Sequence, residues 1–384
     1  MPSDRRRSKP KMPCLSTAGL LLELRNFIDA HPPLAQLGQS NPSWPKVIMF
    51  CEDLEAHRDV RQALTLLHMR SQMEFERALF CAWTSLLVAM RLNLALQHQR
   101  ALFYAGLLQD VGKYLPATES KVQPLQKPAN SPFGGDISDA HPLASSVQME
   151  ASLPDVDGLS ELILYHHARE DGTGYPRQIS ESQLPLDCQV LILANELNDR
   201  IDRLGGHNKL PQLMPGLRLG SLLYFERAHR GWLDLLEPLV CDLDCQSLER
   251  YQKVMSPRRD ILRRLIVALL SVSAELLPYD FDFRVHAARV AIRKLARIVV
   301  DTGVISESID PDLDGLPMEV KCEIELVLRG AVDFIVPCRS RLKAVLDSGR
   351  FALNAAISVE AMALLDHALA ELRQPQDSIS LFRF

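Results

Sequence analysis

The spacing of apolar residues constrains the fold of this chain more than any other sequence feature. In residues 282–304, Val285, Ala288, Ile292, Leu295 and Val299 fall on one stripe, which is the pattern of an amphipathic helix. Aromatic residues make up only 6% of the chain, and its abundant Leu, Ala and Arg favour helix. No stretch alternates convincingly as a strand would. The sequence therefore predicts an all-α fold.

Helical patterns recur along the chain between breaks at prolines and glycines. We expect helices at residues 16–30, 46–70, 73–92, 97–108, 141–153, 186–203, 217–239 (as one or two helices), 259–277, 282–304, 318–335 and 359–373. A linker rich in Pro, Gly, Asn and Ser is expected at 31–43, and an irregular excursion at 114–140. Pro337 and Gly349 are expected to separate shorter helical pieces.

Composition and charge restrict the functional class. The chain has 384 residues, 47% of them hydrophobic and 24% charged, which is ordinary for a soluble globular protein with two or three domains. A net charge of -5 argues against a general nucleic-acid binder. The eight cysteines are scattered without zinc-finger spacing, so we interpret them as reduced thiols. No apolar run is long enough to span a membrane, and we expect a cytoplasmic location.

The stretch 163–176 carries the most chemistry. His166 and His167 follow an apolar run, and the string Asp171-Gly172-Thr173-Gly174-Tyr175-Pro176 comes four residues later. Imidazole is the commonest metal ligand, and the glycines give the loop backbone freedom. Taken alone, the histidine pair would fit an ordinary helix end before a turn.

Other polar residues at expected helix ends could converge with this pair. They are Asp110, Lys113 and His141. Helical bundles build metal sites from histidine and acidic side chains on several helices. The corresponding chemistry is attack of a metal-activated hydroxide on a phosphodiester.

Residues 74 to about 204 resemble the HD-GYP family, a branch of the HD metal-dependent phosphohydrolases that cleaves the bacterial messenger cyclic di-GMP. The matching segments are 106–113 (Gly-Leu-Leu-Gln-Asp-Val-Gly-Lys), Lys127-Pro128, His141-Pro142, 165–176 and 186–195. The resemblance implies an HD-domain-like helical bundle with an additional C-terminal helical region. We expect a disordered basic tail at 1–15, N-terminal helices and a linker at 16–70, a degenerate HD-GYP-like domain at 71–250 and a C-terminal helical domain at 255–384.

Three supporting ligand positions depart from the family pattern, and Ala168 stands where the family has an acid after the double histidine. Arg77 stands at the position of an early histidine ligand, Gln109 replaces the histidine of the HD dyad, and Asn195 replaces a late aspartate. The resemblance implies that one metal relies on these positions and that the other relies on Asp110, His141, His166 and His167, which are all present. We therefore expect at most one divalent metal, Fe, Mn or Zn, and hypothesise that Arg77 substitutes electrostatically for the lost ion.

These matches and departures leave three functions open. The first is a non-hydrolytic regulatory module of cyclic di-GMP signalling. It would bind the nucleotide through Lys113 and the loop, or bind a partner such as a GGDEF-type diguanylate cyclase through Asp171, Gly172, Gly174, Tyr175 and Pro176. The second is a cyclic di-GMP phosphodiesterase with a reduced metal site, in which Asp110 and Lys113 would be catalytic. The third is a structural role. We rank the first above the second because the resemblance implies that three metal ligands are replaced.

A second segment of the chain also resembles part of the family pattern. Residues 286–290, His-Ala-Ala-Arg-Val, resemble the opening of a first HD helix, but no HD dyad follows them. We interpret this segment as an ordinary amphipathic helix.

Overall fold

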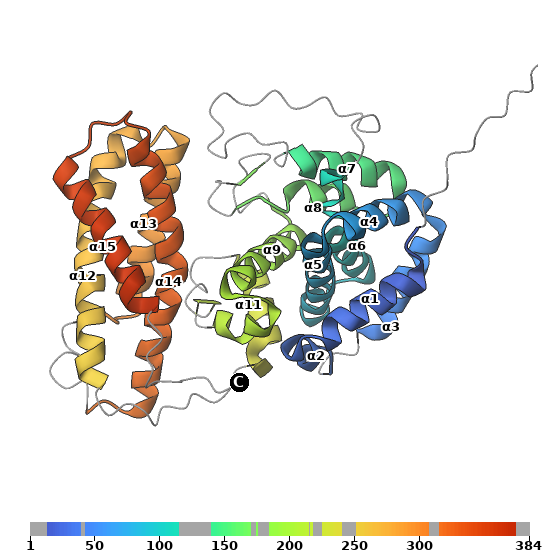
Figure 1. The fold of residues 1–384 in the computed structure, drawn as a ribbon, viewed down its shortest axis with the longest axis horizontal. Helices are drawn as coiled ribbons and strands as arrows, with labels where there is room; N and C mark the ends of the chain where they lie inside the picture. Colours follow the sequence, from blue (N-terminus) through green and yellow to red (C-terminus); the bar gives the residue numbers. More distant parts are fainter. Residues whose placement is uncertain are drawn as a thin grey trace, which may run out of the picture. The chain divides into compact units, whose positions relative to one another are not determined.

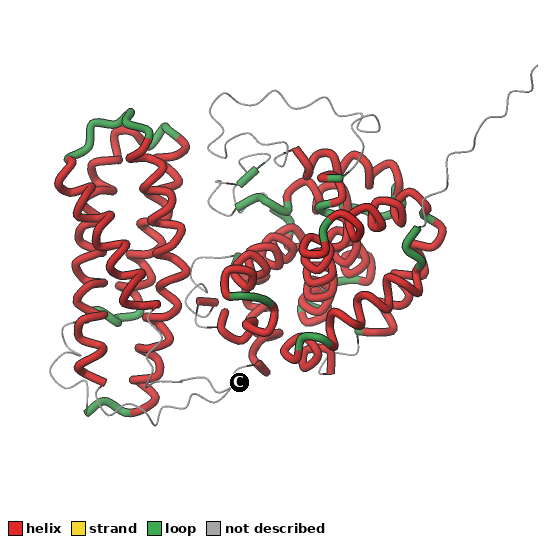
Figure 2. Tube along the Cα trace, viewed as in Figure 1, coloured by secondary structure: helices red, strands yellow, loops and turns green. Residues whose placement is uncertain are grey.

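The computed structural model of the protein describes residues 14–39, 43–114, 140–169, 174–175, 184–214, 216–217, 225–239, 251–306 and 315–373. Within these ranges every regular element is a helix (Figures 1 and 2). The predicted all-α fold is therefore confirmed. The chain forms two compact units, and the division along the sequence falls between Arg203 and Leu204. The predicted domain boundaries near residues 70 and 250 stay predictions.

The first unit begins with short helices. They are α1 (Thr17–Asp29), α2 (Pro32–Gln39), α3 (Trp44–Asp53), the 3-10 turn η1 (Leu54–Ala56) and α4 (Arg58–Arg70). The side chain of Ser16 caps α1 by accepting a hydrogen bond from the amide of Gly19 at 3.0 Å, which satisfies one of the unpaired amides at a helix start.

Two predictions in this region were wrong. The linker expected at 31–43 contains α2, because prolines in the first helical turn fit a helix start, where their missing N–H groups would have no partner. The single helix expected at 46–70 is broken at His57, whose backbone leaves the helical region with φ −103 and ψ 81. The ring of His57 instead contacts the carbonyl of Ser152 at 3.0 Å.

The centre of the first unit is a close pair of helices, α5 (Gln72–Arg91) and α6 (Leu96–Leu108). A Cβ on Gly106 would lie 2.4 Å from the backbone nitrogen of Ala82, so only glycine permits this approach. The other elements of the unit follow as η2 (Val111–Lys113), α7 (His141–Ser152), α8 (Leu159–Tyr165) and α9 (Leu186–Leu204). The starts and ends of these elements carry the polar residues singled out in the sequence.

The second unit contains η5 (His207–Leu213), α11 (Glu226–Leu236) and η6 (Glu237–Leu239), followed by four longer helices with the short turn η8 (Leu277–Tyr279) between the first two. These are α12 (Tyr251–Leu276), α13 (Phe283–Asp301), α14 (Met318–Asp347) and α15 (Ala355–Arg373). Each packs against two of the others, in the ring order α12, α13, α14, α15. Their apolar stripes enclose one core that includes Leu265, Leu295, Leu328 and Leu365.

Two prolines lie inside these helices. Pro257 falls within α12 and Pro337 within α14, so the expected helix start at residue 259 and end near residue 335 were wrong. A proline removes one helical hydrogen bond. Ile335 and Cys338 are buried on either side of Pro337, and their burial in the core offsets that loss. No helix of the described ranges is long and apolar enough to cross a membrane.

Candidate metal centre

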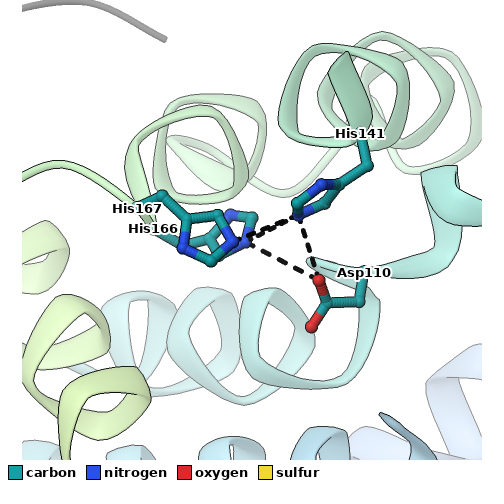
Figure 3. Close-up of side chains that lie close together, drawn as sticks. All are labelled: Asp110, His141, His166 and His167. Atoms are coloured by element: carbon teal, nitrogen blue, oxygen red, sulfur yellow. Dashed lines mark hydrogen bonds and ion pairs between the residues drawn. The ribbon is translucent and has the colours of Figure 1, made fainter. Parts of the chain in front are cut away.

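Four side chains of the first unit meet at the ends of three helices. Asp110 follows α6, His141 is the first residue of α7, and His166 and His167 follow α8. One ligand atom from each of them lies within 4.8 Å of the others (Figure 3). The structure thus brings together the four residues that the sequence analysis proposed as a half-site.

A close backbone approach places Asp110 beside His141. A Cβ on Gly112 would lie 2.6 Å from the carbonyl oxygen of His141. The amide of Gly112 donates a hydrogen bond to the hydroxyl of Ser145 at 2.8 Å. The glycine two residues after Asp110 therefore lets η2 lie directly on the start of α7.

The imidazoles turn their Nε2 atoms toward one another. The Nε2 atom of His141 lies 3.2 Å from that of His166 and 3.2 Å from that of His167. The Nδ1 atom of His166 lies 2.6 Å from the carbonyl oxygen of Ile163, and that contact requires the proton on Nδ1. The lone pair of Nε2 then faces the cluster, which is the arrangement of a metal-ligating histidine.

Electrostatics keep these donors in the forms that bind metals. Burial lowers the pKa of His166 to about 3, and burial together with His166 lowers the pKa of His167 well below its ordinary value. Burial opposes ionisation of Asp110, but contact with His141 and the charge of Lys113 hold the pKa of its carboxyl well below the usual range. Neutral imidazole and ionised carboxylate are the ligating forms.

The donor set fits one divalent cation. Both carboxylate oxygens of Asp110 are buried. Oδ1 has ion-pair contacts with Lys113 at 2.8 Å and His141 at 3.1 Å, whereas Oδ2 accepts no hydrogen bond from the residues that the structure describes. A buried polar atom without a hydrogen-bond donor calls for an ion or another partner near the carboxylate. Three imidazoles and a carboxylate suit Zn, Fe or Mn better than Mg or Ca. The cluster is thus a His/Asp group that could hold a metal ion, whose identity the donors leave open.

Lys113 adds a positive charge beside Asp110. Its Nζ lies 2.8 Å from Oδ1 of Asp110 and 3.0 Å from a carboxylate oxygen of Glu74. Burial opposes protonation, but the two carboxylates raise the pKa of Lys113 above its ordinary value. Lys113 was predicted from the sequence as a site residue, but its partner Glu74 was not.

Arg77, Gln109 and Asn195, which the family resemblance predicts to be replaced ligand positions, also lie together. The amide nitrogen of Gln109 donates to Oδ1 of Asn195 at 2.9 Å, and the amide nitrogen of Asn195 donates to Oε1 of Gln109 at 2.8 Å. Nε of Arg77 donates to Oδ1 of Asn195 at 3.2 Å, and Nη2 of Arg77 lies 2.8 Å from Asp199. Asp199 was not predicted as the partner of Arg77.

Part of the Gly-Tyr-Pro loop contacts the cluster. The ring of Tyr175 stacks on His167, with centroids 4.6 Å apart, and the amide of Tyr175 donates to the carbonyl of His167 at 3.3 Å. A Cβ on Gly174 would lie 2.3 Å from that carbonyl oxygen. The predicted loop residues Asp171, Gly172 and Pro176, like Lys127-Pro128, lie outside the described residues.

A family of known proteins matches the part of the chain that contains the four clustered donors. Residues 61–212 match the family model described as an HD domain. This HD-domain region contains all four clustered donors, and the predicted HD-domain-like fold is confirmed. No solved structure matches the chain significantly.

A curated protein is also similar. The 3'3'-cGAMP-specific phosphodiesterase 1 of Vibrio cholerae serotype O1 is 26% identical over 178 residues, which cover 44% of this chain and 38% of that protein. The chain thus spans less than half the length of this relative. The likeness supports a relation between this chain and a cyclic dinucleotide phosphodiesterase.

Proposed function

We propose that the protein is a degenerate HD-GYP-type module of bacterial cyclic dinucleotide signalling that binds its ligand without hydrolysing it. In this proposal Asp110, His141, His166 and His167 hold at most one divalent metal. The observation that carries the proposal is the reciprocal hydrogen bonding between Gln109 and Asn195.

The amide pair removes ligands where a second metal would need them. Each amide nitrogen donates to the oxygen of the other side chain, so the oxygens that could face a cation are already engaged. Amide oxygens also carry no charge, in contrast to carboxylates. Arg77 adds a permanent positive charge at the same place. The two-metal clamp on the attacking and leaving oxygens of a phosphodiester would then be missing.

The remaining half-site could still take part in ligand binding. A bound divalent metal would supply polarisation of a phosphate oxygen. Lys113 supplies a positive charge beside Asp110, and Tyr175 places an aromatic ring against His167. The ligand class is a cyclic dinucleotide, cyclic di-GMP or 3'3'-cGAMP, because both present two anionic phosphodiesters. The first follows from the family resemblance and the second from the name of the relative.

Binding and hydrolysis assays on the purified full-length protein test this proposal. Bound Fe, Mn and Zn are quantified, ligand binding is measured by calorimetry, and conversion of each cyclic dinucleotide to linear products is followed by chromatography. We expect a complex without turnover. The control variant is His98→Ala, which removes a histidine that is 48% exposed and paired with Asp187.

Single-metal hydrolysis is the second candidate, favoured by the intact cluster of one carboxylate and three imidazoles. Metal-dependent turnover that His166→Ala abolishes and His98→Ala preserves would establish it and refute the non-hydrolytic proposal. Failure to bind either metal or nucleotide would favour a structural role instead.

The loop at residues 171–176 is the proposed docking site for a partner such as a GGDEF-type diguanylate cyclase. Loss of binding to a purified cyclase domain in Pro176→Ala, with binding retained in the control His98→Ala, would support this part of the proposal.

A further inference from the structure

The two oxygens of Asp110 face different partners. Oδ1 lies 3.1 Å from Nε2 of His141, 3.8 Å from Nε2 of His166 and 2.8 Å from Nζ of Lys113. Oδ2 lies 3.9 Å from Nε of Arg77. In Figure 3 the imidazole contacts of Asp110 reach one oxygen only. The carboxylate therefore lies between the histidine cluster and a guanidinium. A carboxylate that bridges two metal ions has a similar position, with the two ions about 3.5–4 Å apart.

Arg77 is held in a setting that would suit a cation. Its Nη2 pairs with Asp199 at 2.8 Å, its Nε donates to Asn195 at 3.2 Å, and its side chain is only 16% exposed. Burial opposes the charged form, but Asp199 and Asp110 raise the pKa of Arg77 above its ordinary value. The guanidinium consequently stays protonated at every physiological pH.

We propose that the guanidinium of Arg77 occupies the place of a second cation on the Oδ2 side of Asp110. It thereby limits the centre to one metal ion and weakens the binding of that ion. This inference rests on the proposed function, which assigns the single metal to the histidine side of Asp110.

The physical reason is charge repulsion through a shared ligand. A divalent ion at Oδ1 and the guanidinium at Oδ2 are both attracted by the same buried carboxylate and repel each other across it. Solvent screens such a pair poorly because Asp110 is 1% exposed. The neutral amides of Gln109 and Asn195 cannot take over as charged ligands, so removal of the arginine charge should tighten the one site without creating another.

Calorimetric titration of the full-length, chelator-stripped protein with Zn²⁺ tests the inference without any activity assay. We expect the wild type to bind one equivalent. Arg77→Gln should also bind one equivalent, but about tenfold or more tightly. Arg77→Lys keeps the charge and should stay within about threefold of the wild type.

Arg100→Gln provides a matched control. Arg100 is also a partly buried arginine with two carboxylate partners, Asp53 and Asp155. It lies in the first half of α6, eight residues or about 12 Å along the helix axis before the end of the helix that precedes Asp110. Its removal should leave Zn²⁺ affinity unchanged. If Arg77→Gln does not fold, Arg77→Met keeps the aliphatic stem and carries the same expectation.

The outcomes separate this inference from the proposed function. The wild type could bind one equivalent of Zn²⁺ while Arg77→Gln and Arg77→Met bind Zn²⁺ with the wild-type affinity. This result overturns the role of Arg77 but leaves the single-metal site in place. Two equivalents in the wild type overturn the inference as well. A wild type that binds no metal overturns the metal site itself, and the role of Arg77 with it.

Discussion

The imidazole of His166 is fully enclosed, with 1% of the residue exposed. Its Nδ1 is tied to the carbonyl of Ile163, and burial lowers its pKa to about 3. The folded protein thus holds this histidine neutral at pH values where the unfolded chain would protonate it, near the ordinary pKa of about 6.5. The same burial that prepares a ligand therefore makes stability depend on pH.

The metal-free protein should lose stability as the pH falls below about 6. In this range the unfolded state binds a proton at His166 and the folded state does not, which costs about 1.4 kcal/mol per pH unit. His167, with its pKa also lowered, acts in the same direction. The lowered pKa of Asp110 does not contribute here, since its stabilisation is lost only below about pH 4. Urea unfolding at pH 7.5, 6.0 and 5.0 in the presence of a chelator measures the effect.

The variant His166→Gln is the comparison that isolates this residue. It should show a shallower loss of unfolding free energy between pH 6.0 and 5.0 than the wild type. Equal slopes for the two proteins would contradict the buried, neutral state of His166.

At the scale of elements, the approach of α5 and α6 determines where Asp110 lies. Gly106 lies two residues before the end of α6, and a Cβ there would meet Ala82 backbone atoms at 2.4 and 2.5 Å. Backbone atoms of a packed helix cannot give way as a side chain can. The variant Gly106→Ala must therefore separate the helices.

We expect Gly106→Ala to lower the free energy of unfolding by about 1–3 kcal/mol or more. It should also weaken Zn²⁺ binding, because Asp110 follows directly after α6. Urea unfolding and calorimetry measure the two effects. Gly19→Ala is the control, since its Cβ would meet only side-chain atoms of Leu15 and Ser16 at 3.2 and 3.3 Å. It should change stability by no more than about 1 kcal/mol. A Gly106→Ala variant as stable as the control would refute the close approach.

The sequence predicted elements well where the apolar period was strong, as in α5 and α13. It failed where tertiary contacts overrode local signals. The prolines at 32–33 start a helix, His57 interrupts one, and Pro337 lies inside one. A proline has opposite effects at a helix start and in a helix interior, and single-sequence patterns do not show which surface will be buried on either side of it.

The candidate site was predictable in its parts and less so in its connections. The histidines and Asp110 carry a recognisable motif, and the structure brings them together; that Arg77, Gln109 and Asn195 replace metal ligands stays a prediction from the same resemblance. The hydrogen bonds between Gln109 and Asn195 join residues 86 positions apart in the chain, and no periodicity in the sequence encodes that pairing. The links of Arg77 to Asp199 and of Lys113 to Glu74 were invisible for the same reason.

At the scale of the whole molecule, the four helices α12 to α15 share a core of their own. Its buried members, among them Leu262, Ile292, Ile335 and Leu365, come from these helices, apart from Val304 just after α13. A bundle that encloses its apolar stripes internally has the property expected of an independent folding domain.

Residues 251–373 expressed alone should therefore fold. We expect a helical circular dichroism spectrum and a cooperative thermal transition. Leu328→Ala in this fragment should lower the free energy of unfolding by about 2–5 kcal/mol, because the residue is fully buried in the core. A fragment that melts without a cooperative transition, or that is indifferent to Leu328→Ala, would contradict an autonomous bundle.

The reciprocal pair of Gln109 and Asn195 has a consequence for how this protein can change over evolutionary time. Replacing either residue alone by a metal ligand breaks the reciprocal hydrogen bonding of the pair in a buried place, at a cost of about 1–3 kcal/mol. A new cation site would appear only after both substitutions, and Arg77 would still repel the ion. Each single substitution therefore lowers the stability of the protein before any metal can bind. Selection for stability alone then disfavours the return of a second cation site.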